Sequence, residues 1–470
     1  MVGRENERAL FQNILKSSSS EFVAVYGRRR VGKTYLIREV FNNNFHFHFT
    51  GMAKASLRQQ LINFHTALKK RNPEKDFTVP ATWFDAFQQL TEHIEKSTDD
   101  RKVIFIDELP WIDTAKSNCI SALEHFWNSW ASARKDIVLI VCGSSASWMI
   151  NKLINNKGGL HNRVTKKIKL LPFTLKECEQ FLAEKKSNWN RYQIVEAYMA
   201  LGGIPYYWNA LEPGYSAAQN IDRLFFSANG LLREEFQNLF ASLFKKSENH
   251  VAIVDALGTK AKGLSRKEII KHAKWDSSGT ATKAITELEA SGFIRKYVPF
   301  NKKTKESVYQ LIDLYSLFYL RFIKGNISAT ENFWINAIDS PQHRTWSGYS
   351  FEMVCLLHSH QIKKELGIQG IQSTESSWRS KSTKNGAQID LVIDRKDETV
   401  NLCEMKFSVN PFIIDKKYAE VLRNKIGTFR SETKTRKAVM LTMITTYGLK
   451  KNEYSQGLIQ NDLTMDCLFE

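Results

Sequence analysis

Residues 22–41, which read FVAVYGRRRVGKTYLIREVF, decide the fold of the first part of the chain. The stretch begins with an apolar run typical of a buried strand and ends with a helix-like run. Between the two, residues 27–34 match the pattern G-x-x-x-x-G-K-[ST]. Glycines let backbone N–H groups curl around phosphates, and the helix N-terminus attracts their negative charge. The order of strand, loop and helix therefore predicts a phosphate-binding loop in an α/β domain with a parallel sheet.

We expect the side chains at the end of this loop to hold ATP and Mg²⁺. Lys33 would reach the β- and γ-phosphates, and the hydroxyl group of Thr34 would bind Mg²⁺. A second apolar run, residues 103–106, ends in Asp107 and Glu108. At the end of a strand that meets the phosphates, Asp107 would hold Mg²⁺ through water and Glu108 would polarise the attacking water. The two motifs together predict ATP hydrolysis.

Two further groups are candidates for the same site. A third apolar run, residues 137–142, precedes Ser144 and Ser145. A serine at this place would sense the γ-phosphate, whereas the alternative is an ordinary turn after a strand. Arg163 would supply positive charge to the transition state as a catalytic residue, unless it only faces solvent.

Several stretches resemble one group of proteins, the STAND/AAA-type P-loop ATPases of archaea and bacteria. VGRENE at 2–7 resembles the adenine-side motif of that group, GRRRVGKT at 27–34 its arginine-rich Walker A motif, and FIDELPW at 105–111 its Walker B motif. LGGIPYY at 201–207 resembles an element of the helical lid, in which a proline lies near the adenine; a simple helix C-cap at Gly202 is the alternative. With the residues above, the resemblance completes the predicted nucleotide-binding set: Gly3, Arg4, Gly27, Arg30, Gly32, Lys33, Thr34, Asp107, Ser144 and Pro205.

Residues 246–329 are predicted to form a winged helix-turn-helix. Helices are expected at 251–257, 266–273 and 277–291, the last with Ser277 as N-cap, and strands at 293–300 and 308–312. The third helix of such a module enters the major groove, and the wing contacts phosphates. The residues expected to face DNA are Thr280, Thr282, Lys283 and Thr286 on the helix and Lys302, Lys303 and Lys305 on the wing. A packing or interaction module is the alternative, and residues 313–322 are expected to be an aromatic core.

Two apolar strands near the C-terminus carry charged residues. Asp390 interrupts the strand 389–393, and Glu404 and Lys406 share one face of the strand 401–407. A hairpin would bring Asp390 beside Glu404, so that both bind Mg²⁺ while Lys406 orients or deprotonates a water. Glu352, in a helical stretch, would complete a catalytic site for phosphodiester hydrolysis.

This arrangement resembles the PD-(D/E)XK nuclease pattern and the C-terminal domain that accompanies the ATPase group. A structural pairing of Lys406 with one of the carboxylates is the alternative. Tyr418 and Lys425, on a following helix, would contact DNA or face solvent. The polar stretch 373–384 is expected to be a loop.

Composition sets the remaining expectations. The net charge of +18 and the pI of about 9.4 favour a polyanionic partner, DNA first, over a merely basic surface. Six scattered cysteines without a CxxC pair fit a reducing compartment. The sequence contains no stretch long and apolar enough for a membrane helix, so a cytoplasmic protein without a membrane partner is expected, and a homo-oligomer is possible.

The predicted architecture is therefore α/β in several parts. It consists of an AAA-like P-loop ATPase core at 1–170, a helical lid at 171–245, the winged helix-turn-helix at 246–329 and an α/β restriction-endonuclease-like domain at 330–470. We expect an ATP-hydrolysing, DNA-acting protein whose Mg²⁺-dependent nuclease is gated by the nucleotide. The alternative is a nucleotide-switched DNA-binding or signalling module in which the nuclease-like domain is inactive.

Overall fold

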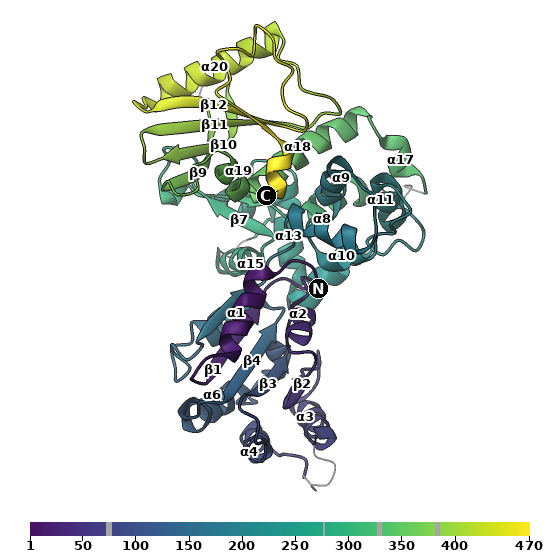
Figure 1. Ribbon diagram of the computed structural model, residues 1–470, viewed down its shortest axis with the longest axis vertical. Coiled ribbons are helices and arrows are strands. Elements are labelled where there is room, and N and C mark those ends of the chain that lie inside the picture. The colour runs from purple at the N-terminus through teal and green to yellow at the C-terminus, as the bar shows by residue number, and fades with distance from the viewer. Residues whose placement is uncertain (72–77, 276–277, 327–330, 381–385) are drawn as a thin grey trace. The chain divides into compact units, whose positions relative to one another are not determined.

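The computed structural model describes residues 1–71, 78–275, 278–326, 331–380 and 386–470 (Figure 1). The chain divides into two compact units, Met1–Pro172 and Phe173–Glu470. Each unit is described by itself. The finer boundaries predicted after residues 245 and 329 stay predictions.

The first unit is built on a five-stranded parallel sheet with the strand order β2-β3-β4-β1-β5. Its strands are β1 Glu21–Tyr26, β2 Phe47–Thr50, β3 Lys102–Asp107, β4 Ile137–Gly143 and β5 Lys166–Lys169. The three strands predicted at 22–26, 103–106 and 137–142 are thus confirmed as β1, β3 and β4. Their residues are almost all buried, as expected for strands that are covered on both faces.

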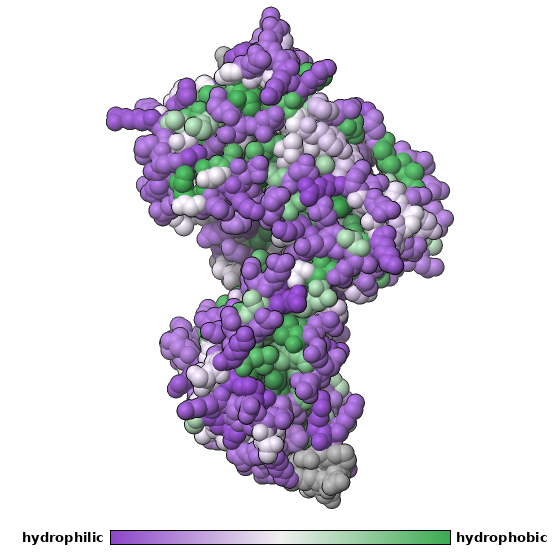
Figure 2. Space-filling model, in the orientation of Figure 1, coloured by the Kyte–Doolittle hydropathy of each residue, from purple (hydrophilic) through white to green (hydrophobic). Residues whose placement is uncertain are grey.

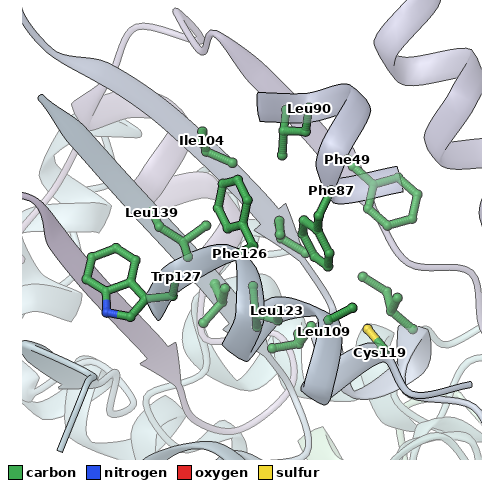
Figure 3. Close-up of a cluster of buried hydrophobic side chains, with 14 of the residues drawn as sticks. Phe49, Phe87, Leu90, Ile104, Leu109, Cys119, Leu123, Phe126, Trp127 and Leu139 are labelled. Carbon is green, nitrogen blue, oxygen red and sulfur yellow. The ribbon is translucent and has the colours of Figure 1, made fainter. Parts of the chain in front are cut away.

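Helices cover this sheet and carry its apolar core. They are α1 Glu5–Leu15, α2 Lys33–Val40, α3 Leu57–Arg71, α4 Trp83–Ile94, α5 Leu109–Ile112, α6 Cys119–Ser129 and α7 Ala146–Trp148, with the short helical turns Ala131–Ala133 and Met149–Ile154. Figure 3 shows how Ile104 and Leu139 of the sheet meet Phe87 of α4 and Phe126 of α6. The rings of Phe87 and Phe126 stack with centroids 5.2 Å apart. This aromatic layer fixes the strands whose ends form the candidate site.

The second unit opens with five helices: α8 Leu175–Glu184, α9 Arg191–Leu201, α10 Pro205–Asn209, α11 Ala217–Phe225 and α12 Glu235–Leu243. Thr174 caps α8 in a reciprocal pair with Glu177. Gly202 ends α9 with a φ of 62°, which is the helix C-cap given above as an alternative. At Gly203 a Cβ would lie 1.9 Å from the carbonyl oxygen of Phe173, so two backbone segments approach closely there.

Three helices and a small antiparallel sheet follow. They are α13 Ser247–Gly258, β6 Leu264–Ser265, α14 Arg266–His272, α15 Ser278–Ala290, β7 Ile294–Tyr297, the turn Thr304–Glu306 and β8 Val308–Leu311, with the strand order β6-β8-β7. The predicted N-cap, Ser277, lies outside the described residues. The side chains predicted to face outward are exposed: Thr280, Thr282, Lys283, Thr286, Lys302, Lys303 and Lys305.

The rest of the second unit joins a helical segment to a mixed sheet. Its elements are α16 Leu314–Phe318, the turn Tyr319–Ile323, α17 Phe333–Ala337, α18 Pro341–Leu357, α19 Ser359–Glu365, β9 Ser373–Arg379, β10 Gln388–Arg395, β11 Thr399–Lys406, α20 Lys416–Thr433, β12 Ala438–Thr445, β13 Asn461–Thr464 and the turn Met465–Phe469. The strand order is β13-β12-β11-β10-β9. β9, β10 and β11 pair antiparallel, and β11, β12 and β13 pair parallel. Tyr315, Phe318 and Phe322 are buried, which confirms the predicted aromatic core.

The polar stretch predicted as a loop at 373–384 is in part a strand. Residues 373–379 form β9, which pairs with β10 at the edge of the sheet. Polar residues fit an edge strand because much of it stays in water, and its one fully buried side chain is Trp378. The prediction was therefore wrong for 373–379, while residues 381–384 lie outside the described residues.

Hydrophilic residues predominate on the face of the molecule shown in Figure 2. Within the described part of the chain, no helix is both long and apolar enough to span a membrane.

Candidate functional site

The predicted phosphate loop connects β1 to α2 in the first unit. Gly27 follows β1 with a φ of 149°, and a Cβ at this position would lie 2.3 Å from the carbonyl oxygen of Leu170. Arg30 and Gly32 have φ values of 71° and 89°, and Gly32 is the N-cap of α2. The loop thus turns through left-handed conformations and leads directly into the N-terminus of a helix, the geometry that a phosphate-binding loop needs.

The ammonium group of Lys33 points into this loop. Its side chain is nearly buried, at 6% exposure, and Nζ donates hydrogen bonds to the carbonyl oxygens of Gly27 (3.1 Å) and Arg28 (2.9 Å). Both of these hydrogen-bond partners are neutral, so phosphate oxygens would add charged acceptors to a nearly buried cation.

The two ATPase motifs meet through their polar side chains. Thr34 Oγ1 donates to Asp107 Oδ2 at 2.9 Å, while Asp107 Oδ1 accepts from the backbone N–H of Glu108 at 3.0 Å. The Cys142 thiol also donates to Asp107 Oδ1, at 2.8 Å, and burial followed by the nearby Asp107 charge raises the pKa of this thiol. Sequence reasoning missed Cys142. The only indication is the strand register: Ile106 of β3 pairs with Val141 of β4, so the next residues, Asp107 and Cys142, lie side by side.

Glu108 is held by the residue that follows β4. Ser144 donates to Glu108 Oε2 from its backbone N–H at 3.0 Å and from its hydroxyl group at 2.9 Å. Ser144 is 2% exposed, so of the two candidate serines it is the one that reaches the site. Burial raises the pKa of Glu108, an effect that Lys33 partly opposes. Ser144 therefore positions Glu108, and its predicted contact with the γ-phosphate stays a prediction.

The remaining nucleotide-site candidates lie in three places. Arg4 is buried and donates from Nη2 to the carbonyl oxygen of Val31 at 3.2 Å, so it contacts the loop between β1 and α2, and the adenine-side role of Gly3 and Arg4 stays a prediction. Arg163 is exposed at the end of a turn. Pro205 opens α10 in the second compact unit. The predicted roles of Arg163 and Pro205 stay predictions.

The chemistry of this first-unit site fits a magnesium nucleotide. The Lys33 ammonium group and the N-terminus of α2 can bind phosphates. The Thr34 hydroxyl group and the Asp107 carboxylate, whose oxygens lie 2.9 Å apart, are hard oxygen ligands for Mg²⁺. Glu108 lies next to them at the same strand end, as a base for water must.

A second group of charged side chains gathers in the second unit. Leu391 of β10 pairs with Cys403 of β11, so Asp390 and Glu404 are the next residues along the two antiparallel strands. Lys406 Nζ lies 3.1 Å from Glu404 Oε1, as the shared strand face predicted.

Glu404 is enclosed by side chains of α20. It is 7% exposed and accepts from the Tyr418 hydroxyl group at 2.7 Å and from Lys425 Nζ at 2.6 Å. Burial alone would raise the pKa of Glu404, but the ammonium groups of Lys425 and Lys406 lower it on balance. Tyr418 and Lys425 were expected to contact DNA or to face solvent; the solvent-facing alternative was wrong, and the contact with DNA stays a prediction. They turn inward because a buried carboxylate needs donors.

Asp390 and Glu352 share a cation that sequence reasoning missed. Lys262, in the turn between α13 and β6, makes an ion pair with Asp390, and its Nζ lies 3.7 Å from Glu352 Oε2. Gln388 Nε2 also donates to Asp390 Oδ1 at 2.9 Å. Burial raises the pKa of Glu352 and lowers that of Lys262. No sequence signal links Lys262 to these carboxylates, since 128 positions separate it from Asp390.

Lysine side chains, rather than open space, therefore surround the candidate metal ligands. Within the described residues, no group of three or more His, Cys, Asp or Glu side chains is arranged to hold a metal ion. The donor set still suits Mg²⁺, because Asp390 and Glu404 are carboxylates at neighbouring positions of two paired strands. Their role as metal ligands stays a prediction.

Comparisons with known proteins agree with the first-unit site. Residues 1–211 match the model of a family described as an ATPase domain predominantly from Archaea. The first part of the chain is therefore a nucleotide-binding ATPase domain with the α/β fold and parallel sheet of P-loop ATPases.

The chain is also similar to individual proteins. It is 27% identical over 357 residues to the uncharacterized protein MJECL04 of Methanocaldococcus jannaschii, a match that covers 75% of this chain and 76% of the relative. Among solved structures it resembles the Walker-type ATPase PABY2304 of Pyrococcus abyssi, with 16% identity, a TM-score of 0.48, and 68% and 96% of the two chains covered. The ORC2 protein of Aeropyrum pernix, in its ADPNP and ADP complexes, matches with 12% identity, a TM-score of 0.39, and 67% and 91% covered.

Proposed function

We propose that the protein hydrolyses ATP in its first unit and uses the nucleotide state to control Mg²⁺-dependent cleavage of DNA by its C-terminal domain. The observation that carries the proposed DNA cleavage is that Asp390 and Glu404 adjoin the paired residues Leu391 and Cys403, while Lys406 Nζ lies 3.1 Å from Glu404 Oε1. Two carboxylates that hold Mg²⁺ and a lysine that acts on a water could together hydrolyse a phosphodiester.

The ATPase half rests on the contacts between the two motifs. Magnesium ATP, when bound, would supply the phosphoanhydride bond, and Lys33, which is hydrogen-bonded to the loop carbonyl groups, would bind its phosphates. Thr34 and Asp107, already hydrogen-bonded, would hold the metal on one side. Glu108, fixed by Ser144, would orient the attacking water and accept its proton.

The proposed DNA binding rests on the three-helix module. The order α13, β6, α14, α15, β7 and β8 with a β6-β8-β7 sheet is the order that we would expect of a winged helix-turn-helix, and it supports this proposal. α15 would be the recognition helix, and its threonines and Lys283 are exposed. The turn between β7 and β8 would be the wing, and its lysines are exposed as well.

The proposed nuclease activity rests on both the topology of the C-terminal domain and its side chains. A helix, α18, precedes an antiparallel β9-β10-β11 sheet, and α20 then crosses over to β12, which pairs parallel with β11. This is the arrangement expected of a restriction-endonuclease-like core. Lys406 would act on the attacking water, while Tyr418 and Lys425 would keep Glu404 ionised and in place.

One observation favours the alternative of a nucleotide-switched DNA-binding or signalling module. Asp390, Glu352 and Glu404 all contact lysine side chains, as they would in a purely structural ion-pair cluster.

Incubation with DNA separates the two functions. Supercoiled plasmid and linear DNA should be cut by the full chain with Mg²⁺, and the rate should differ with and without ATP. Gel electrophoresis measures both effects. If neither Mg²⁺ nor Mn²⁺ supports cleavage of either DNA, with or without ATP, the nuclease function is wrong and only the switch remains.

We also expect DNA binding to be strongly salt-dependent. Bound lysines release counterions from DNA, so the logarithm of the affinity should fall linearly with the logarithm of the salt concentration. Reversing the charge of Lys302, Lys303 and Lys305 should weaken binding by roughly tenfold or more in moderate salt and flatten this slope, by about one unit per lost phosphate contact. Fluorescence anisotropy at several salt concentrations measures both quantities.

A matched control keeps the overall charge equal. Reversal of three exposed lysines of the first unit, Lys54, Lys69 and Lys70, changes the net charge by the same amount. If this variant loses as much affinity as the wing variant, the wing makes no specific contact. Binding that does not depend on salt would leave the module only a packing role.

A further inference from the structure

The carboxylate site of the second unit holds a cation from another part of the fold. Lys262 belongs to the turn that joins α13 to β6, whereas Asp390 lies on β10 and Glu352 on α18. The Lys262 side chain is 30% exposed, against 16% for Asp390 and 23% for Glu352. Its ammonium group contacts Asp390 and lies 3.7 Å from a Glu352 carboxylate oxygen. It therefore sits where a cation shared by two carboxylates would sit.

Side-chain hydrogen bonds fix the turn that carries Lys262. The Tyr297 hydroxyl group donates to the Lys262 carbonyl oxygen at 2.8 Å. Gln310 Nε2 and the Tyr349 hydroxyl group each donate to the Ala261 carbonyl oxygen at 2.9 Å. Tyr297 and Gln310 belong to β7 and β8 of the small antiparallel sheet, and Tyr349 belongs to α18. The position of Lys262 is thus built into the fold from both sides.

Gly263 tightens the same turn. Its φ is 83°, and a Cβ at this position would lie 2.1 Å from the carbonyl oxygen of Tyr309 on β8. Glycine is required where a left-handed conformation meets so close a backbone approach. The turn consequently has little room to shift, and the Lys262 side chain starts from a fixed point.

The carboxylates of this site have cationic partners without a metal ion. Lys406 and Lys425 contact Glu404, and Lys262 contacts the two other carboxylates. The guanidinium group of Arg295 also lines the cavity that holds those two carboxylates. A divalent ion added to this set would lie against the Lys262 ammonium group, and like charges repel strongly where burial reduces screening. Metal binding and the present position of Lys262 therefore oppose each other.

We propose that Lys262 occupies the divalent-cation position beside Asp390 in the candidate nuclease site, so that Mg²⁺ binds Asp390 only after the ammonium group has moved out. The inference rests on the proposed function, since it treats this cluster as a metal site. Because the turn itself is held in place, the movement that frees the site is one of the Lys262 side chain, and a ligand that draws this side chain out of the site raises the metal affinity. By linkage, metal binding strengthens the binding of that ligand by the same factor.

Titration of the nucleotide-free full chain with Mn²⁺ tests the proposal. Lys262→Met keeps the length of the side chain and removes the charge. It should bind Mn²⁺ roughly five- to tenfold more tightly than the wild type, the effect of one partly exposed ion pair. The metal-free variant should melt at a lower temperature, because two carboxylates lose their cation, and Mn²⁺ should raise its melting temperature more than that of the wild type. Calorimetric titration and thermal melting measure these changes.

Two variants define the controls. Lys260 lies in the same turn but pairs with Glu268 at 2.9 Å, so Lys260→Met should leave Mn²⁺ affinity unchanged. Asp390→Asn should remove the Mn²⁺ binding that Lys262→Met strengthens. Should Lys262→Met fail to fold, Lys262→Gln carries the same test with a polar side chain.

The outcomes separate this inference from the proposed function. Unchanged or weaker Mn²⁺ binding by the uncharged Lys262 variants, or the absence of an Asp390-dependent Mn²⁺ site in both wild type and variants, overturns the inference. Tighter Mn²⁺ binding without any DNA cleavage supports the inference and overturns the nuclease function instead.

Discussion

Replacing Glu108 with glutamine is expected to leave ATP binding intact and to lower ATP hydrolysis by about a thousandfold, within the range typical of a lost general base. Glutamine keeps the size of the side chain and still accepts the two hydrogen bonds from Ser144, at 3.0 Å and 2.9 Å in the native protein. The variant loses only the negative charge that orients water and takes its proton. Nucleotide binding by fluorescence and phosphate release under saturating ATP measure the two effects separately.

The pH profile gives this prediction a second observable. Burial raises the pKa of Glu108, so its carboxyl group takes up a proton at a higher pH than an exposed glutamate does. Only the ionised form accepts a proton, so hydrolysis should decline as the pH falls through this raised pKa, and Glu108→Gln should lack that limb of the profile.

Lys33→Ala is the matched comparison for Glu108→Gln. It removes the cation that the loop holds against the Gly27 and Arg28 carbonyl groups, so it should lose nucleotide binding itself. Equal hydrolysis rates in the wild type and Glu108→Gln would contradict the assignment of Glu108 as the base. A loss of nucleotide binding in Glu108→Gln would mean that Glu108 contributes to ATP binding itself and not only to the hydrolysis step.

The first unit could be predicted well from sequence because its chemistry is local. Gly27 to Thr34 specify a loop, a cap and a helix start within one short segment, and the apolar run before Asp107 specifies a buried strand. Parallel strands then bring Thr34 and Asp107 together whatever the details of the connections. The contact of Cys142 with Asp107 could not be predicted, because a cysteine at the end of a buried strand has the pattern of an ordinary core residue. Only the pairing of β3 with β4 brings its thiol to the Asp107 carboxylate.

The second site could be predicted only in part. The alternation of side chains along a strand placed Glu404 beside Lys406, and a hairpin placed Asp390 near Glu404. The inward turn of Tyr418 and Lys425 depends on how α20 packs on the sheet, which no local pattern encodes. β9 was mistaken for a loop for a related reason: an edge strand needs few apolar residues, so its sequence carries little periodic signal.

Replacing Asp390 with asparagine should abolish Mg²⁺-dependent DNA cleavage and leave ATP hydrolysis unchanged. The change removes one of the two predicted metal-ligand charges but keeps a polar side chain that Gln388 and Lys262 still face. Loss of groups that merely support a metal ligand already costs about 10- to 100-fold, so loss of a ligand should lower cleavage by roughly a hundredfold or more. Cleavage of plasmid and release of phosphate from ATP, measured on the same preparation, check both halves of the prediction.

A second carboxylate of the same strand supplies the control for this prediction. Asp394 also lies on β10 and pairs with Lys437 at 2.7 Å, as an ordinary ion pair would. Asp394→Asn should therefore keep cleavage near the wild-type rate. In a structural ion-pair cluster, both substitutions would lower the melting temperature and neither would affect any activity. In a metal site, Asp390→Asn loses cleavage and Asp394→Asn does not, even if the lost contact with Lys262 also lowers the melting temperature. The ratio of the two cleavage rates thus decides whether Asp390 serves a reaction or only the fold.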